Sequence, residues 1–152
     1  MRIEQNSQLV VENGGKLIIE AGANINLVDA NSKIVVREGG ELIINGQPSI
    51  TGNGHIRFEQ GNVFTLNSNL VLRGTGRNNP IIVFGQDATV TVANPVELRI
   101  EDAALVSIPG PSYPQRHLWL KNGATLKANN ALFDDQAGTL NYSVFIGSGR
   151  PI

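Results

Sequence analysis

The side chains that could carry out chemistry are few in this sequence and lie far apart. The only histidines are His55 and His117, and there is no cysteine. Neither an HxH nor an HExxH spacing is present, so the ligand patterns of common zinc sites are missing. Acidic pairs occur at Glu101-Asp102 and Asp134-Asp135, but no Ser/His/Asp order and no phosphate-binding glycine loop accompanies them. The sequence therefore predicts no catalytic residue, no metal site and no cofactor.

A second group of residues has the chemistry of a carbohydrate contact. Tyr113, Arg116, His117 and Trp119 lie close together in the sequence. Tyr and Trp rings offer flat apolar faces with polar edges, which suit the faces of sugar rings. We therefore take these four residues as candidate ligand contacts, with carbohydrate as the ligand. The alternative is that Tyr113 and Trp119 cover a bare part of the protein's core.

The elements that must position these residues follow from an internal repeat. Residues 6–19, NSQLVVENGGKLII, recur as residues 31–44, NSKIVVREGGELII, at an offset of 25 positions. Farther along, the likeness reduces to pairs of apolar residues that flank one variable residue, each followed by a short run of turn-prone residues. Alternating apolar residues indicate strands, and a repeat of this length is typical of a solenoid. Helix is a poor alternative because frequent Gly-Gly and Asn-Gly pairs interrupt any helical period.

The pattern places three strands in each of five successive coils. The expected strands are Leu9–Val11, Leu17–Ile19 and Ile25–Leu27; Ile34–Val36, Leu42–Ile44 and a weaker one around Ile50; Ile56–Phe58, Phe64–Leu66 and Leu70–Leu72; Ile82–Phe84, Val90–Val92 and Leu98–Ile100; and Val106–Ile108, Leu118–Leu120 and Leu126–Ala128. Residues 73–80 and 109–116 then fall between strands as protruding loops.

Charged residues distinguish such a stack from an antiparallel sandwich, which also has short, evenly spaced strands. Residues one repeat apart would lie in adjacent coils of a stack. In that register opposite charges meet three times: Glu12 with Arg37, Arg37 with Glu59, and Lys16 with Glu41. A sandwich does not require this coincidence. The same register places Ile18 beside Ile43.

The coil pattern over residues 6–133 resembles the right-handed parallel β-helix family, which includes bacterial surface and secreted proteins, phage tailspikes and pectin-degrading enzymes. The resemblance implies an all-β fold, a right-handed β-solenoid with three strands per coil and about five to six coils. We expect it to form a single domain over residues 1–152 that is a segment of a longer protein.

Pectin-degrading members of this family use aspartate clusters on one face, so two motifs invite comparison. Gly52-Asn53-Gly54-His55-Ile56 is faintly similar to the GHG motif of polygalacturonases, and Asp134-Asp135 is similar to their paired aspartates. In those enzymes the aspartates precede the histidine, whereas here they follow it and lie some three coils away. We therefore expect His55 to be a solvent-facing residue at the start of a strand and the aspartates to form a turn after Leu132-Phe133.

Charge and hydropathy argue against two classes of partner. The net charge is −1, the pI is near 6.1, and Lys and Arg are scattered, so no basic surface is expected for nucleic acid or an anionic membrane. No apolar run reaches the length of a membrane helix, which argues against membrane insertion, and the first residues lack the apolar region of a signal peptide. The chain either has no such signal or is a piece of a longer secreted protein, at a cell surface or in a virion.

The middle residue of each expected strand faces away from the core, because successive side chains alternate between faces. Val10, Ile18, Val35 and Ile43 then form one exposed apolar patch across the first two coils, whereas later middle positions are mostly polar. A contiguous apolar patch usually marks an interface, and each end coil has unpaired backbone groups. We therefore expect self-association, or packing against neighbouring domains of a parent protein.

Two functions from different classes fit the sequence. The first is a non-catalytic structural or adhesive rod within a bacterial surface, secreted or phage fibre protein. The alternative is a carbohydrate-active enzyme fragment with a cleft between residues 73–80 and 109–116, or a β-helix that binds carbohydrate without cleaving it. The first is favoured because acidic residues are too few on any one face for a catalytic groove.

Overall fold

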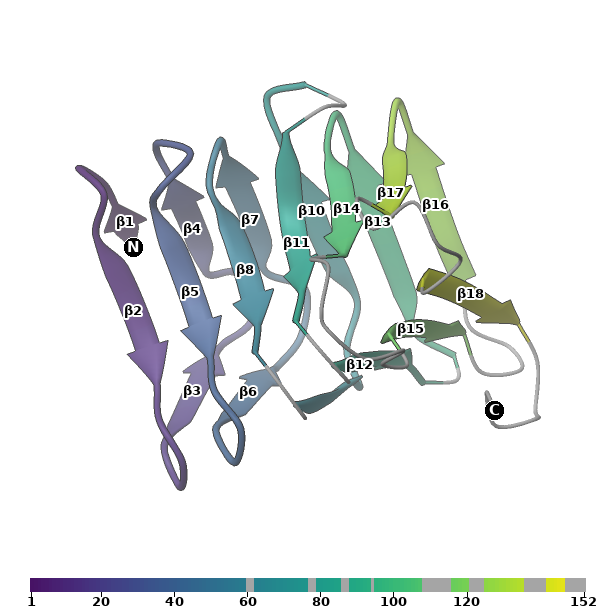
Figure 1. The fold of residues 1–152 in the computed structure, drawn as a ribbon, viewed down its shortest axis with the longest axis horizontal. Coiled ribbons are helices and arrows are strands. Elements are labelled where there is room, and N and C mark those ends of the chain that lie inside the picture. Colours follow the sequence, from purple (N-terminus) through teal and green to yellow (C-terminus); the bar gives the residue numbers. More distant parts are fainter. Residues whose placement is uncertain are drawn as a thin grey trace.

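A computed structural model describes residues 1–59, 62–76, 79–85, 88–93, 95–107, 116–120, 125–135 and 142–146. In these residues all regular structure is β-strand, in the eighteen strands of Figure 1. Within the same residues no helix is long and apolar enough to span a membrane.

The strands form four sheets in which each strand pairs with the strand three places away in the chain. Sheet A contains β1 (Arg2–Ile3), β4 (Asn24–Leu27), β7 (Ser49–Gly52), β10 (Leu70–Arg73), β13 (Glu97–Glu101) and β16 (Thr125–Asn129). Sheet B contains β2 (Gln8–Val11), β5 (Lys33–Val36), β8 (His55–Phe58), β11 (Pro80–Phe84), β14 (Ala104–Ser107) and β17 (Leu132–Asp135). Sheet C contains β3 (Lys16–Ile19) and β6 (Glu41–Ile44), and sheet D contains β9 (Val63–Leu66), β12 (Thr89–Val92), β15 (Arg116–Leu120) and β18 (Tyr142–Ile146).

The sheets are the sides of a stack of coils. Figure 1 shows sheet B in front, sheet A behind it, and the strands of sheets C and D crossing below. Every strand pair is parallel, as between β2 and β5. The chain is therefore an all-β parallel solenoid of about four turns up to residue 107, and β15 to β18 extend its ladders. This confirms the predicted fold class, while the right hand and the count of five to six coils stay predictions.

The register of sheet B follows the repeat in the first four coils. Leu9 pairs with Ile34, Ile34 with Ile56, and Ile56 with Ile82, as predicted. The weaker strand expected around Ile50 is also confirmed, since β7 contains this residue and its side chain is fully buried. Alternation of inward and outward residues therefore holds even where the sequence likeness is low.

The fifth coil begins in a different frame from the predicted strand Val106–Ile108. Ile82 pairs with Leu105, which lies in the core, and the register of β11 shifts between Pro80 and Ile82. Residues 103–106 are apolar at four successive positions, so a period of two fits either frame, and the shift in β11 selects the frame with Leu105 inside. The predicted frame was wrong by one residue, and the end of that predicted strand lies outside the described residues.

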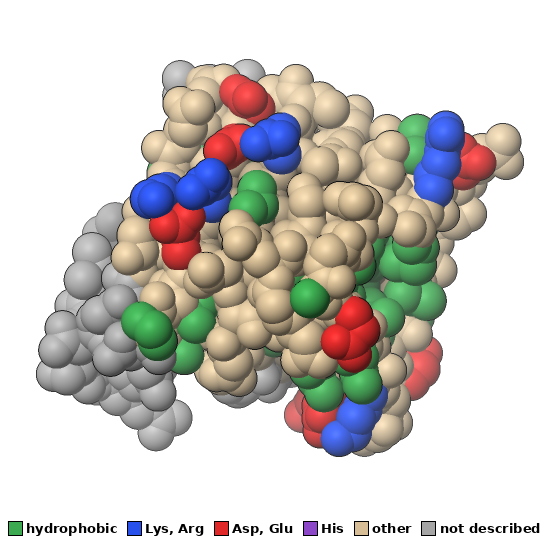
Figure 2. Space-filling model, turned by 180° about the vertical axis from the view of Figure 1, so that it is seen from behind, with side chains coloured by type: hydrophobic (Ala, Val, Ile, Leu, Met, Phe, Trp, Pro, Cys, Tyr) green, Lys and Arg blue, Asp and Glu red, His purple; other side chains and the backbone are tan. Residues whose placement is uncertain are grey.

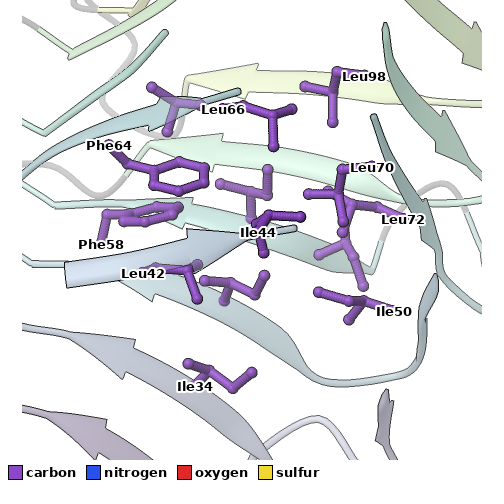
Figure 3. Close-up of a cluster of buried hydrophobic side chains, with 14 of the residues drawn as sticks. Ile34, Leu42, Ile44, Ile50, Phe58, Phe64, Leu66, Leu70, Leu72 and Leu98 are labelled. Atoms are coloured by element: carbon purple, nitrogen blue, oxygen red, sulfur yellow. The ribbon is translucent and has the colours of Figure 1, made fainter. Parts of the chain in front are cut away.

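Branched aliphatic side chains fill the space between the sheets (Figure 3). They stack in columns along the solenoid because residues one coil apart are in register. Phe58 and Phe64 extend this stack with rings that lie 5.1 Å apart between centroids. Complete burial of one such Ile, Leu or Phe contributes about 1.5–3 kcal/mol, so the continuous core is the main stabilising term.

Two glycines allow the corner before β8 to approach the preceding coil at backbone distance. Gly52 has a φ of 115°, and a Cβ there would lie 2.2 Å from the carbonyl oxygen of Leu27. A Cβ at Gly54 would lie 2.0 Å from the carbonyl oxygen of Ser32. The Gly52–Gly54 segment, which is faintly similar to a catalytic motif, is therefore required by coil packing.

Candidate interaction surface

The charged residues on the outside of the first three coils form ion pairs from coil to coil. Arg37 Nη1 lies 2.8 Å from Glu12 Oε1, and Arg37 Nε lies 3.5 Å from Glu59 Oε2. Lys16 Nζ lies 2.9 Å from Glu41 Oε2. All three predicted pairs are confirmed. Because the groups are largely exposed, each pair contributes only about 0–1 kcal/mol, and their main value is in specifying the register.

The apolar residues of sheet C form the most exposed part of the predicted patch. Ile18 and Ile43 pair across β3 and β6, as predicted, and Ile18 is 49% exposed while Ile43 is half-buried. Lys16 and Glu41 pair two positions earlier on the same strands, and therefore on the same outer face. Sheet C thus presents two apolar side chains beside one cation and one anion.

Val35 is only 3% exposed, so its predicted exposure was wrong. It lies on β5 between β2 and β8, opposite Val10 on one side and Arg57 on the other. Lys33 and Arg37 flank it along the chain on the same face. Long neighbouring side chains can cover a small branched residue in the middle of a sheet. Val10 is half-buried, so sheet B adds little exposed apolar surface to sheet C.

The outward-facing residues that pair from strand to strand along sheet B also differ from the prediction in the later coils. Val83 pairs with Arg57 and with Val106, and both valines are buried outside the main core cluster. The predicted polar residue Ser107 instead pairs with Phe84, as a consequence of the shifted frame. This column is therefore apolar on both sides of Arg57.

His55 begins β8 on the outward face, as predicted, but it is half-buried and not fully open to solvent. It pairs with Lys33 on β5 and lies two residues from Arg57. Burial, and then the charges of Lys33 and Arg57, lower its pKa from 6.5 to about 4, so the ring is neutral at neutral pH. Its Nδ1 and Arg57 Nε are buried with no hydrogen-bond partner in the described part of the chain. A histidine without a carboxylate to orient it lacks the partner that a general base normally has.

Asp134 and Asp135 lie within β17, so the predicted turn at these residues was wrong. They pair with Val106 and Ser107 of β14. Along sheet B, β17 is three strands from β8, or about 15 Å at the usual spacing between strands. The structure therefore does not bring the aspartates and His55 together.

The candidate carbohydrate contacts are described only in part. Tyr113 lies outside the described residues. Arg116, His117 and Trp119 lie in β15, where His117 pairs with Thr89 and Trp119 with Thr91. Their backbones form an ordinary parallel ladder, and their role in ligand binding stays a prediction.

A row of charged residues on sheet A was missed at the sequence level. Arg73 Nη2 lies 2.6 Å from Glu101 Oε2, and Glu97 pairs with Arg99 and Lys127 at 2.9 and 2.8 Å. The hydrogen bond from Lys127 is the main cause of a lowered pKa at Glu97, which Arg99 lowers further against the effect of burial. Alternation along β13 places Glu97 and Arg99 on one face and the offset of one coil pairs Arg73 with Glu101, whereas Lys127, which lies opposite Arg99, reaches Glu97 diagonally.

The two signs of charge balance on this side of the molecule. Figure 2 shows basic and acidic side chains lying against one another on the rear face, and apolar side chains beside charged ones at the lower right, toward the N-terminal strands. Within the described residues, no group of three or more His, Asp or Glu side chains could hold a metal ion. The outward chemistry of these residues is thus pairing between coils.

No protein-family model, no curated protein and no solved structure matches this chain.

Proposed function

We propose that the chain is a non-catalytic structural or adhesive segment, a right-handed β-helical rod or platform within a bacterial surface, secreted or phage fibre protein. The observation that carries this proposal is the arrangement of charge. Among the described residues, five of the eight ion pairs join neighbouring coils, as do Glu12–Arg37 and Glu97–Lys127, and the other three lie within one coil. A catalytic groove needs carboxylates that converge on one space, whereas these carboxylates support a stack. The right hand is proposed because parallel crossovers are right-handed in the great majority of sheets.

We propose further that sheet C is the lateral contact between two copies of the chain. A two-fold axis parallel to β3 and β6, passing between them, would place Ile18 against Ile43 of the second copy. The same axis would place Lys16 against Glu41 of the second copy, so both the apolar and the charged groups are complementary. An isologous contact of this kind is the commonest form of dimer interface.

The association is expected to be weak. A stable dimer buries about 800 Å² on each partner, and the four outward residues of sheet C cover much less. Neighbouring copies in a fibre or on a surface meet at high local concentration, where weak contacts suffice. The edges of β2 and β3 at the N-terminal end also lack a partner strand in the described residues, which suits packing against further coils of a parent protein.

Light scattering coupled to gel filtration over a range of concentrations tests the lateral contact. We expect the wild type to shift toward dimer as its concentration rises and the Ile18→Lys, Ile43→Lys variant to stay monomeric. Asn24→Lys, Asn26→Lys is the matched control, because it adds two charges at exposed positions of sheet A. A wild type that is monomeric throughout, or a control that is equally impaired, would contradict the contact.

Charge exchange tests the orientation of the two copies. Lys16→Glu should weaken the dimer because it places a carboxylate opposite Glu41 of the other copy and beside Glu41 in the next coil of the same chain. The double exchange Lys16→Glu, Glu41→Lys restores opposite signs in both places and should recover association. If the double variant does not associate although circular dichroism shows that it is folded, this two-fold arrangement is excluded.

Absence of catalysis is tested directly with polysaccharides. Incubation with polygalacturonate and with common plant and capsular glycans, with and without Ca²⁺, should yield no new reducing ends and no unsaturated products. Turnover that disappears in Asp134→Asn, Asp135→Asn or His55→Gln would support the enzyme alternative instead.

A further inference from the structure

One corner of the solenoid is longer in the fourth coil than in the third. The two corners begin and end in register, since Leu66 pairs with Val92 and Leu70 with Leu98. In the third coil Leu70 comes four positions after Leu66, whereas in the fourth coil Leu98 comes six positions after Val92. The two additional residues have no counterpart in the third coil. Of the described residues of this longer corner, Pro95 is exposed and Val96 packs into the core, and together they form a wall beside the shorter corner.

A break between sheets lies on the other side of the same corner. β6 of the second coil pairs with β3, and β9 of the third coil pairs with β12, but sheets C and D are not joined between β6 and β9. The corner that follows β6 is therefore not held against the corner that follows β9 by a strand ladder. Between this break and the wall of the fourth coil lies an open notch with a volume of about 410 Å³.

The notch is lined by neutral polar groups and an apolar wall. Gln47, Asn67, Ser68 and Asn69 contribute the polar groups, and Pro95 and Val96 contribute the wall. None of the lining side chains is charged, in contrast to the ion-paired faces of the stack. An ionic ligand would therefore gain little from the lining itself.

The amides of the notch have hydrogen-bonding capacity to spare. Asn69 Oδ1 accepts a bond of 2.8 Å from the backbone of Glu97, which fixes the side chain against the wall and directs its NH₂ group elsewhere. The NH₂ group of Asn67 donates only a long bond of 3.5 Å, to the backbone of Thr65. A side-chain amide offers two donors and an acceptor, so several of these positions remain for a ligand.

We propose that this notch is a binding site for a neutral polyhydroxylated ligand of the size of a single sugar ring. Vicinal hydroxyl groups donate and accept at adjacent positions, as side-chain amides do, and the apolar face of the ring packs against the exposed Pro95. The site is separate from β15, which carries Arg116, His117 and Trp119 of the residues first considered for carbohydrate contact. It is centred on the corner and not on the outer face of sheet C, so it can be tested separately from the proposed dimer, although Gln47 closely follows β6.

Titration of the ¹⁵N-labelled protein with glucose, galactose, mannose and cellobiose tests the site by NMR. We expect at least one of these sugars to produce saturable shifts that cluster at the backbone amides of Gln47 and 67–69. Asn67→Ala and Gln47→Ala should each weaken binding about five-fold, the usual effect of removing one neutral hydrogen bond. Galacturonate should bind no more tightly than galactose, because the lining carries no cation.

Asn13→Ala is the control, because this asparagine is exposed in the turn between β2 and β3, at a different corner of the solenoid, and should leave binding unchanged. Retained dispersion of the Ile50 amide reports that each variant is folded, and Gln47, whose side chain is exposed, provides a test even if Asn67→Ala does not fold. Shifts that never saturate, equal shifts with glycerol, or binding that survives both alanine variants would overturn the proposal.

Discussion

A disulfide between positions 18 and 43 measures the register on which the whole description depends. Ile18 and Ile43 are paired neighbours on adjacent parallel strands. At the usual strand spacing of about 4.8 Å, their Cα atoms fall inside the range of about 4.4–6.8 Å that a disulfide spans. Ile18→Cys, Ile43→Cys should therefore oxidise without displacement of the backbone. Since both side chains face outward, the exchange leaves the core intact.

The expected gain in stability follows from the loop that the bond closes. A loop of about 25 residues loses an entropy that corresponds to about 3.5 kcal/mol at 25 °C in the unfolded chain, and engineered bonds often give less. We expect the oxidised variant to exceed its own reduced form by about 2–3.5 kcal/mol in the free energy of unfolding. Comparing oxidised with reduced protein removes the cost of the substitutions themselves.

Urea unfolding of the isolated monomer provides the measurement, after oxidation at low protein concentration so that copies do not cross-link. The mismatched pair Ile18→Cys, Asn45→Cys is the control, because position 45 lies two residues farther along the second coil and pairs with Glu20. Its sulfur atoms should not meet without strain. If the control oxidised readily and the matched pair did not, the register would be refuted together with the coil-to-coil ion pairs.

Two further predictions concern the corner and strand around His55. Because burial and the neighbouring cations lower the pKa of His55 from 6.5 to about 4, the unfolded chain takes up the proton first. Above pH 6.5, His55 should therefore have no effect on the free energy of unfolding, and as the pH falls from 6.5 to 4 it should lower that free energy by on the order of 1–2 kcal/mol, after allowance for solvent screening. Urea unfolding at both ends of this range should show a smaller loss of stability for His55→Gln than for the wild type. An equal loss in the two proteins would contradict this prediction. Gly54→Ala should destabilise the protein by about 1–3 kcal/mol, because its Cβ meets the Ser32 carbonyl oxygen, whereas the control Gly76→Ala, with 3.6 Å to its nearest neighbour, should change the melting temperature little.

The repeat made the first four coils predictable. The 25-residue offset between the first two coils, and the apolar spacing that continues it in the next two, specify which residues are neighbours, and alternation then specifies which of them face inward. The fifth coil shows the limit of this reasoning. Four successive apolar residues, 103–106, satisfy a period of two in either frame, and only the register shift in β11 decides between them. Such a shift depends on backbone packing that has no distinct sequence signal.

The exposure of an outward side chain was harder to predict than the face of the sheet to which it points. Val35 and Ile18 both occupy outward middle positions, yet Val35 is buried and Ile18 is half exposed. The difference comes from the neighbours: β5 has a strand on each side, whereas β3 is the edge of a two-stranded sheet. The same reasoning applies to His55, which alternation places outside but whose neighbours bury it. The face to which a side chain points depends on its position along the strand, whereas its burial depends on the side chains around it.

Departures from regular stacking are where a solenoid can acquire a specific function. Core positions are constrained by the columns of the stack, and outward charged positions are largely occupied in pairing with the next coil. What remains free is an edge such as β3, where Ile18 lacks a covering neighbour, and a corner such as residues 67–69, where adjacent coils differ in length. The two proposed sites fall on these two kinds of irregularity. Ile18→Lys on β3 should therefore leave binding at Asn67 and Asn69 unchanged, because no strand ladder joins sheet C to sheet D.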